Sequence, residues 1–227
     1  KQIGADPNYP PKTLDDFINL GQQAKKLIPG NESFVCGWSE DWLINCLAVE
    51  WAINIMGEQK FQDTIAGKVP YTDPQWIEVF SIFAKLRSSG IIPESITTMI
   101  NKEAEDAFSK GKALFSFNGT WAINVYKQLN PDLDYALFSL PVASKDNPVK
   151  IWGGAGTSFM VNPKSPLKDK AVAFLKWLTQ KNQQLTLIHE TNNLPSISGC
   201  ERDLPLILKT ITIDLNSLTH PDRKSVV

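Results

Sequence analysis

The sequence has few of the residues that most enzymes use for nucleophilic or metal chemistry. Its 227 residues include three cysteines and two histidines. Cys36, Cys46 and Cys200 fit no metal-binding spacing, because the sequence contains no Cys-x-x-Cys. Neither His189 nor His220 lies near a Gly-x-Ser-x-Gly, which marks an exposed serine nucleophile. Cysteine and serine hydrolases are therefore disfavoured, and no cofactor or metal is expected.

The three cysteines leave two interpretations open. A disulfide between Cys36 and Cys46 would form in an oxidising compartment. Buried free thiols are the simpler interpretation for all three, because free cysteine is among the most frequently buried residue types.

An excess of positive charge and a long hydrophobic run are also missing. The 23 Lys and Arg residues against 24 Asp and Glu give a net charge of -1, so nucleic acid is not an expected partner. The longest apolar stretch, 42–56, is interrupted by Asn45, Glu50 and Asn54 and is shorter than the roughly 20 residues that span a bilayer. We interpret Lys1, which no leader precedes, as the mature or trimmed end of a longer protein.

Short strands alternate with helices along the chain, which predicts an α/β fold. Apolar spacing and capping residues predict helices at 14–28, 40–56, 74–89, 101–110, 122–129 and 166–178. Alternating patterns predict strands at 34–37, 113–118, 135–140 and 157–161. Ser39 or Asp41 would cap the second helix, and Trp51, Trp76 and Trp177 would pack in the interior. The expected inward face of the last helix consists of Leu167, Ala171, Phe174, Leu175 and Leu178.

Seven tryptophans are many for this length, and several stand where predicted elements meet. The four at junctions are Trp38, Trp42, Trp121 and Trp152. A tryptophan ring can stack on the apolar face of a sugar, while nearby amides and carboxylates bind its hydroxyls. Suitable polar neighbours are Glu40, Asp41, Asn118 and Asn124. Each ring could instead pack in the core, but four at element ends favour a carbohydrate cleft.

The glycine run Gly153-Gly154-Ala155-Gly156 fits neither a P-loop nor a dinucleotide-binding turn. It is either a flexible turn or a place where the backbone approaches a ligand, since glycine has no Cβ. The residues alone leave these two interpretations open.

One stretch resembles a known family. Residues 104–121, AEDAFSKGKALFSFNGTW, are similar to a hallmark of the bacterial extracellular solute-binding proteins of sugar ABC transporters (family 1, maltose-binding-protein-like). The matching positions are Phe108, Gly111, Lys112, Ala113, Asn118, Gly119 and Trp121. The segments PPKTLDDF, FSLPVAS, WGGAGTSFMVNPKSPLKDKAVAFLKWLT and NNLPSISG extend the resemblance over roughly residues 9 to 200.

The resemblance implies a type II periplasmic-binding-protein fold, in which two α/β lobes close on a sugar. This chain would supply mainly the C-terminal lobe and part of the N-terminal lobe. Residues 1–140 would form the core of the C-terminal lobe, and 141–192 would belong to the N-terminal lobe. Residues 193–227 would cross back, incompletely. The chain therefore looks like a fragment that lacks much of one lobe.

The resemblance also implies roles for single residues. Trp121 matches the tryptophan that stacks on the sugar, and Trp38 and Trp42 match an aromatic pair at the start of a cleft-lining helix. The loop contributed across the cleft matches Trp152, Gly153 and Gly154. Trp177 matches a packing position.

The predicted function is the substrate-binding component of an ABC sugar importer, which would bind a mono- or oligosaccharide without chemical change. It would be a monomer that delivers sugar to the permease subunits. Its location would be periplasmic or extracellular, with a lipid anchor as one option. One rival is a glycoside hydrolase that uses Glu40 or Asp41. The other is a binding protein of the same family for a polyamine or peptide, whose cleft would favour carboxylates or open strand edges.

Overall fold

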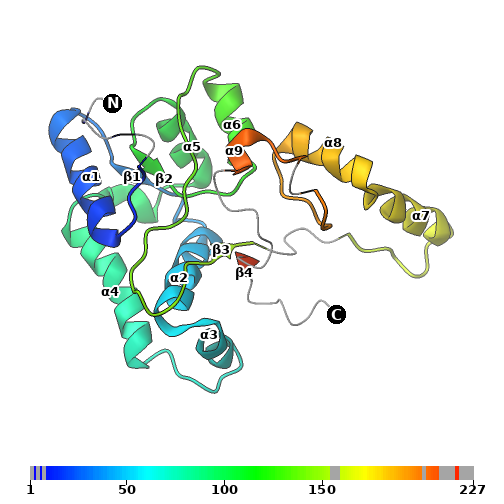
Figure 1. The fold of residues 1–227 in the computed structure, drawn as a ribbon, viewed down its shortest axis with the longest axis horizontal. Helices are drawn as coiled ribbons and strands as arrows, with labels where there is room; N and C mark the ends of the chain where they lie inside the picture. Colours follow the sequence, from blue (N-terminus) through cyan, green and yellow to red (C-terminus); the bar gives the residue numbers. More distant parts are fainter. Residues whose placement is uncertain are drawn as a thin grey trace.

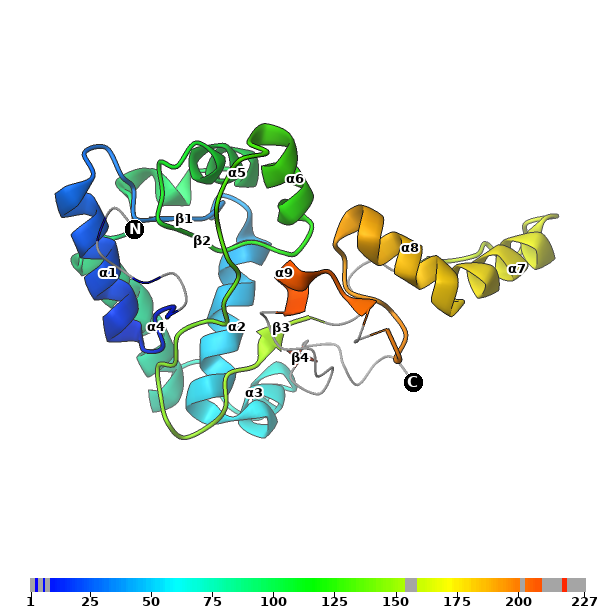
Figure 2. The ribbon, with the colours of Figure 1, turned by 45° about the horizontal axis from the view of Figure 1, so that its top comes forward.

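The computed structural model describes residues 3, 6, 9–153, 159–200, 203–209 and 218–219. Two parts stand out: a body, residues 9–152, and an arm, residues 159–200, that projects from one side of it (Figures 1 and 2). The helices of the body are α1 (Leu14–Leu27), α2 (Asp41–Met56), α3 (Glu58–Ile65), α4 (Pro74–Ser88), η1 (Glu94–Thr97), α5 (Asn101–Ser109) and α6 (Ala122–Leu129). Those of the arm are α7 (Lys168–Leu178) and α8 (Lys181–Thr191), and α9 (Leu206–Lys209) follows it.

Short parallel strand pairs connect distant parts of the chain. β1 (Phe34–Val35) pairs with β2 (Phe115–Ser116), with Phe34 opposite Phe115. β3 (Ile151–Trp152) pairs with β4 (Leu218–Thr219). Parallel strands separated by helices are the signature of an α/β fold, so the predicted class is confirmed.

Two predicted helix starts are confirmed in atomic detail. The Thr13 hydroxyl accepts a hydrogen bond from the Asp16 amide at 3.1 Å, and the Asp16 carboxylate accepts one from the Thr13 amide at 3.2 Å. This reciprocal capping box starts α1. At α4 the Asp73 carboxylate accepts from the Gln75 amide at 3.0 Å, with Pro74 in the first turn.

Helix α2 lies at the centre of the body, between the α1–α4 side and β3 (Figures 1 and 2). Its last eight residues, 49–56, are all buried. The apolar stripe looked imperfect in the sequence because almost every side of this helix is covered. Trp51 and, in α4, Trp76 are buried as predicted. The predicted cap was wrong: Glu40 holds the cap position, and no side chain makes the capping bond.

The predicted strand at 135–140 does not form. The chain there is extended and contacts β2 through Phe115 and Phe138, whose ring centroids lie 5.7 Å apart. The backbone pairing occurs just beyond, where Val142 accepts from the Leu14 amide at 3.1 Å and donates to the Lys12 carbonyl at 2.9 Å. The start of α1 therefore takes the hydrogen bonds that a strand partner would supply. Of the predicted strand 157–161, residues 159–161 are not a strand, and the other two lie outside the described residues.

The arm differs from its prediction in burial. Helix α7 has the expected bounds to within two residues, but it has no buried residue. Phe174 is 55% exposed and Trp177 is 45% exposed, and their rings stack on each other at 5.6 Å. The packing role of Trp177 was therefore wrong for the described part of the chain, which places nothing over this face. Helix α8, which sequence reasoning missed, buries Ile188 in a small cluster with Ile123 of α6.

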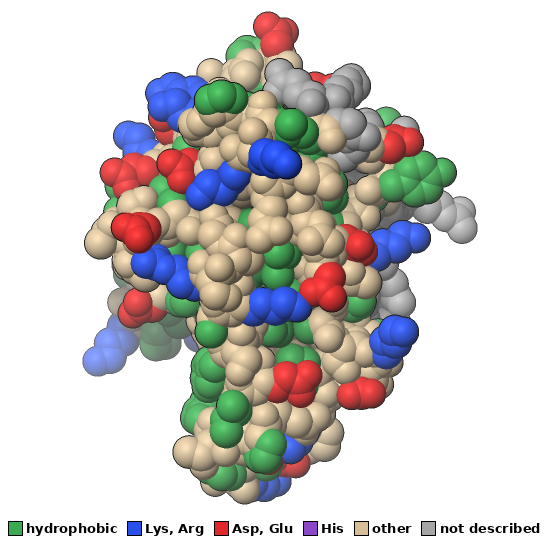
Figure 3. Space-filling view, turned by 90° about the vertical axis from the view of Figure 1, so that its left-hand side faces the viewer, with side chains coloured by type: hydrophobic (Ala, Val, Ile, Leu, Met, Phe, Trp, Pro, Cys, Tyr) green, Lys and Arg blue, Asp and Glu red, His purple; other side chains and the backbone are tan. Residues whose placement is uncertain are grey.

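Surface charge and the cysteines complete the description. The face that carries α1 and α4 shows acidic and basic side chains interspersed (Figure 3). Lys85 of α4 and Asp15 of α1 form one ion pair, with their charged atoms 2.6 Å apart.

All three cysteines are buried and free, so the disulfide interpretation was wrong. Burial raises the pKa of the Cys36 and Cys46 thiols to about 12. Among the described residues, no helix combines the length and hydropathy needed to cross a membrane.

Candidate functional site

Two exposed tryptophans meet where the paired strands β1 and β2 end. Trp42 lies in the first turn of α2, which follows β1, and Trp121 lies directly before α6, which follows β2. Their ring centroids are 5.6 Å apart at 48°, and the residues are 42% and 41% exposed. Ligands bind in α/β folds beyond the carboxyl ends of parallel strands, so this pair occupies a typical position for a site.

Gly119 allows the Trp121 ring its position. A Cβ built on Gly119 would collide with the six-membered ring of Trp121. The indole therefore lies directly over the backbone of the turn, which only glycine permits. The Asn-Gly-Thr turn thus presents the ring rather than merely reversing the chain.

Glu40 holds the second ring of the pair. One carboxylate oxygen accepts from the Trp42 indole N–H at 3.1 Å. The other accepts from the Asn101 amide, at the start of α5, at 2.8 Å. A carboxylate at a helix N-terminus satisfies an otherwise unpaired N–H and complements the helix dipole. Glu40 therefore orients Trp42 and ties it to α5.

Asn118 belongs to a polar network beneath Trp121. Its side-chain nitrogen donates to Asn101 and to Glu105, both at 3.0 Å, and its oxygen accepts from the Gly119 amide at 2.8 Å. Asn101 also donates to the same Glu105 oxygen, again at 3.0 Å. Glu105 is buried and was missed by sequence reasoning. The available signal was its position four residues after Asn101 on a helix, where side chains face each other.

The other predicted site residues are not in this cluster. Trp38 lies in the core, with its ring centroid 5.6 Å from that of Phe83, and its indole N–H has no hydrogen-bond partner in the described structure. Asp41 is exposed at the start of α2. Asn124 donates to the Glu190 carbonyl at 3.1 Å and accepts from Asn192 at 2.6 Å, so it joins α6 to the end of α8.

Trp152 lies against another part of α2. Its amide donates to the Glu50 carboxylate at 2.6 Å, and its side chain packs at the edge of the core. Burial raises the pKa of the Glu50 carboxyl to about 8, against the lowering effect of the bond from Trp152. Glu50 lies about 12 Å along the helix from Trp42, at 1.5 Å per residue. Gly153 is half-buried, and Gly154 lies outside the described residues.

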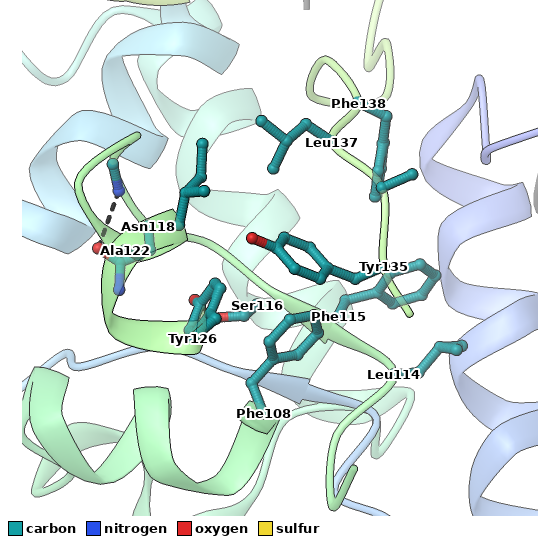
Figure 4. A pocket seen from close by; sticks show the side chains of 13 residues that line it. Phe108, Leu114, Phe115, Ser116, Asn118, Ala122, Tyr126, Tyr135, Leu137 and Phe138 are labelled. Carbon is teal, nitrogen blue, oxygen red and sulfur yellow. Dashed lines mark hydrogen bonds between the residues drawn. The ribbon is translucent and has the colours of Figure 1, made fainter. Parts of the chain in front are cut away.

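A small hollow that is partly open to solvent lies between β2, α6 and residues 135–138 (Figure 4). Its walls are mainly apolar and aromatic, with Phe108, Tyr126 and Tyr135 among them. The Tyr126 hydroxyl pairs with Ser116 at 3.3 Å, and burial raises the tyrosine pKa to about 12. This hollow shares Asn118 with the tryptophan pair but offers few groups for sugar hydroxyls. The described residues contain no group of three His, Cys, Asp or Glu side chains that could hold a metal.

Known proteins resemble this chain along most of its length. Residues 1–207 match the family of bacterial extracellular solute-binding proteins. A multiple sugar-binding protein of Streptococcus mutans is 22% identical over 212 residues, which cover 89% of this chain and 49% of the relative. An uncharacterised ABC transporter extracellular-binding protein of Pyrococcus horikoshii is 31% identical over 134 residues, which cover 58% of this chain and 30% of the relative.

Solved structures share the fold. A chitin oligosaccharide binding protein aligns with a TM-score of 0.73 and 21% identity, over 99% of this chain and 58% of that one. The raffinose complex of a solute-binding protein named RafE aligns with a TM-score of 0.69 and 18% identity, over 88% of this chain and 53% of that one. The type II periplasmic-binding-protein fold is thereby confirmed. The chain spans about half the length, or less, of the curated relatives it matches.

The family match extends over most of the sequence and agrees with the fold. It confirms the resemblance and, with it, the predicted location outside the cytoplasm. The family is one of binding proteins, so the non-enzymatic prediction holds at that level. The chain belongs to the bacterial extracellular solute-binding proteins.

Proposed function

We propose that this protein is the sugar-binding component of an ABC importer and that the pair Trp42–Trp121 is the stacking surface for the sugar. The observation that carries the proposal is the exposure of both rings on a rigid support. Glu40 holds one ring, and Gly119 with the Asn118 network holds the other. Rings that are already oriented lose little entropy when a ligand stacks on them.

The ligand class is supported by the proteins that resemble this chain. Their names and titles mention multiple sugars, chitin oligosaccharide and raffinose. A mono- or oligosaccharide is accordingly the proposed ligand, and the permease subunits of the transporter are the proposed partners. The protein would act as a monomer.

The predicted lobes, 1–140 with 193–227 and 141–192, enter the proposal with one change: residues 141–152 pack on α2 and are therefore placed with the first lobe. Trp152, Gly153 and Gly154 would form a further wall of the sugar site, on the same side as α2. Asp41, exposed beside Trp42, and Asn118 would bind sugar hydroxyls. Trp38 would support the site from the core, because its ring is covered by Phe34 and Phe83.

A hydrolase is less well supported than a binding protein. Both oxygens of Glu40 already accept hydrogen bonds, from Trp42 and Asn101, so this carboxylate is not placed to protonate a glycosidic oxygen. A polyamine-binding cleft would need carboxylates facing the ligand. Glu40 and the buried Glu105 are instead bonded within the protein, which leaves the exposed Asp41 as a single carboxylate beside Trp42.

The test is a titration of the natural full-length protein with mono- and oligosaccharides, followed by tryptophan fluorescence. Trp121→Ala should weaken binding of the responding sugar by about 1 to 3 kcal/mol, the range for loss of an aromatic anchor. Trp177→Ala is the control, because it removes a tryptophan from α7 of the arm, away from the pair. Equal affinity for Trp121→Ala and the parent protein would eliminate the stacking role. If no sugar binds the folded protein, the ligand is another solute.

A further inference from the structure

Three neighbouring side chains of α2 bind one segment of the chain, residues 141–152. The Trp51 indole N–H donates to the Pro141 carbonyl at 3.2 Å. The Glu50 carboxylate accepts from the Trp152 amide at 2.6 Å. These contacts lie at the two ends of the segment through which the body passes into the arm (Figures 1 and 2).

Asn54 binds the middle of the same segment. It is fully buried, and its oxygen accepts from the amides of Ala143 and Ser144, both at 2.9 Å. Its nitrogen donates to the carbonyls of Ser144 at 3.0 Å and Asn147 at 2.5 Å. Asn147 in turn donates to the Ile55 carbonyl at 3.2 Å. One amide side chain thereby uses its full hydrogen-bonding capacity on a single loop.

Glu50 and Asn54 form a polar edge on α2, the most deeply buried helix of the body, and burying these two side chains costs free energy of folding. Apolar residues at 50 and 54 would avoid the desolvation of a carboxyl and an amide. These hydrogen bonds fix the position of residues 141–152 along α2, because each bond can form at one position of the segment only. Apolar packing alone would let the segment shift along the helix. The segment itself has little secondary structure of its own before β3.

We propose that Glu50 and Asn54 form an anchor that fixes residues 141–152 on α2 and so positions Trp152 and Gly153 as a wall of the sugar site. This inference rests on the proposed function. The two side chains are positioning residues: they act on sugar affinity through the backbone of the segment and do not touch the sugar.

The experiment compares Glu50→Leu and Asn54→Leu with two controls in the natural full-length protein. Glu50→Gln keeps an oxygen that accepts from the Trp152 amide, so it should preserve the anchor. Ile53→Val trims a buried neighbour on α2 without touching the segment. Hydrogen exchange of the amides in 141–152 and sugar titration are measured on each variant.

Both leucine variants should raise amide exchange in the segment about tenfold or more, because Glu50→Leu removes one hydrogen bond to the segment and Asn54→Leu removes four, while exchange in α4 stays unchanged. They should also weaken binding of the sugar that the parent protein binds, whereas the two controls should not. If Asn54→Leu prevents folding, the comparison of Glu50→Leu with Glu50→Gln is sufficient for the test.

Unchanged exchange in 141–152 would overturn the anchor. If Ile53→Val loses as much sugar affinity as the leucine variants, the positioning role of Glu50 and Asn54 is wrong and the loss comes from general destabilisation. Failure of the parent protein to bind any sugar would reject the proposed function and, with it, the sugar-site role. The exchange rates would still decide separately whether the anchor holds the segment.

Discussion

The body and the arm both contain helices with an apolar face, yet only the body covers that face. In α4, Trp76, Val79 and Leu86 are buried, as their helical spacing predicts, although Phe80 at the edge of the same stripe is 49% exposed. In α7 the same spacing leaves Phe174 55% exposed and Trp177 45% exposed. The difference teaches that a periodic pattern identifies which face of a helix is apolar, but not which part of a protein covers it. For α7 the proposed second lobe is the natural cover.

The largest expected difference is between two tryptophans. Trp51→Ala in the body should lower the free energy of unfolding by about 3 to 5 kcal/mol, because it leaves a cavity in the core. Trp177→Ala in the arm should change it by less than about 0.5 kcal/mol in this chain, because the ring is exposed. Urea unfolding of both variants measures the contrast.

A large loss for Trp177→Ala in this 227-residue chain would break the comparison between body and arm. The same substitution in a longer natural protein sharpens it. There, a loss of about 2 kcal/mol or more would indicate that another part of the protein covers α7.

The junction between body and arm should make stability depend on pH through Glu50. Its pKa is raised from 4.5 to about 8 by burial, so between these values the folded state binds a proton that the unfolded state has lost. Stability therefore falls as pH rises from about 4.5 to 8, by an amount on the order of a few kcal/mol. Denaturant unfolding at a series of pH values measures this slope.

Glu50→Gln should flatten the slope in that window, because the amide does not titrate. The buried thiols of Cys36 and Cys46 titrate well above it, with pKa values of about 12, so they do not contribute there. A parent protein whose stability is constant from pH 5 to 8 would show that Glu50 is not desolvated as the structure places it.

The smallest effect concerns helix starts. Thr13→Ala should cost about 1 kcal/mol, because it removes the capping box of α1. In the arm, Gln180 precedes α8 and makes no side-chain cap, so Gln180→Ser should instead stabilise that helix by a few tenths of a kcal/mol or more. Thermal unfolding tests the first variant, and hydrogen exchange within α8 tests the second. A stabilised Thr13→Ala variant together with a destabilised α8 in Gln180→Ser would contradict the capping assignment.

The sequence was most informative where structure is local. The capping box at Thr13, the start of α4 at Pro74 and the bounds of α6 follow from neighbouring residues, and all were predictable. The alternating pattern at 135–140 was misleading because these residues find no strand partner, and the backbone pairing with the start of α1 begins only at Val142. Strand formation depends on a partner that the segment itself does not specify.

The candidate site shows the same division. Sequence reasoning could select Trp42 and Trp121 as element-end aromatics, but not that they meet while Trp38, four residues from Trp42, turns into the core. Glu50 and Glu105 were missed because burial and hydrogen-bond partners are tertiary properties. Only the fold brings Glu50 to the Trp152 amide and Glu105 to Asn118.

The tryptophan pair also has an optical consequence. Two indole rings whose centroids lie 5.6 Å apart and whose planes are inclined by 48° are close enough for their electronic transitions to couple. Such coupled chromophores give paired circular dichroism bands of opposite sign, which depend on the angle between the rings. A ligand that stacks on either ring would change the surroundings of that chromophore and with them the shape of the bands. If the pair is the stacking surface proposed above, these bands are an intrinsic, label-free reporter of ligand binding.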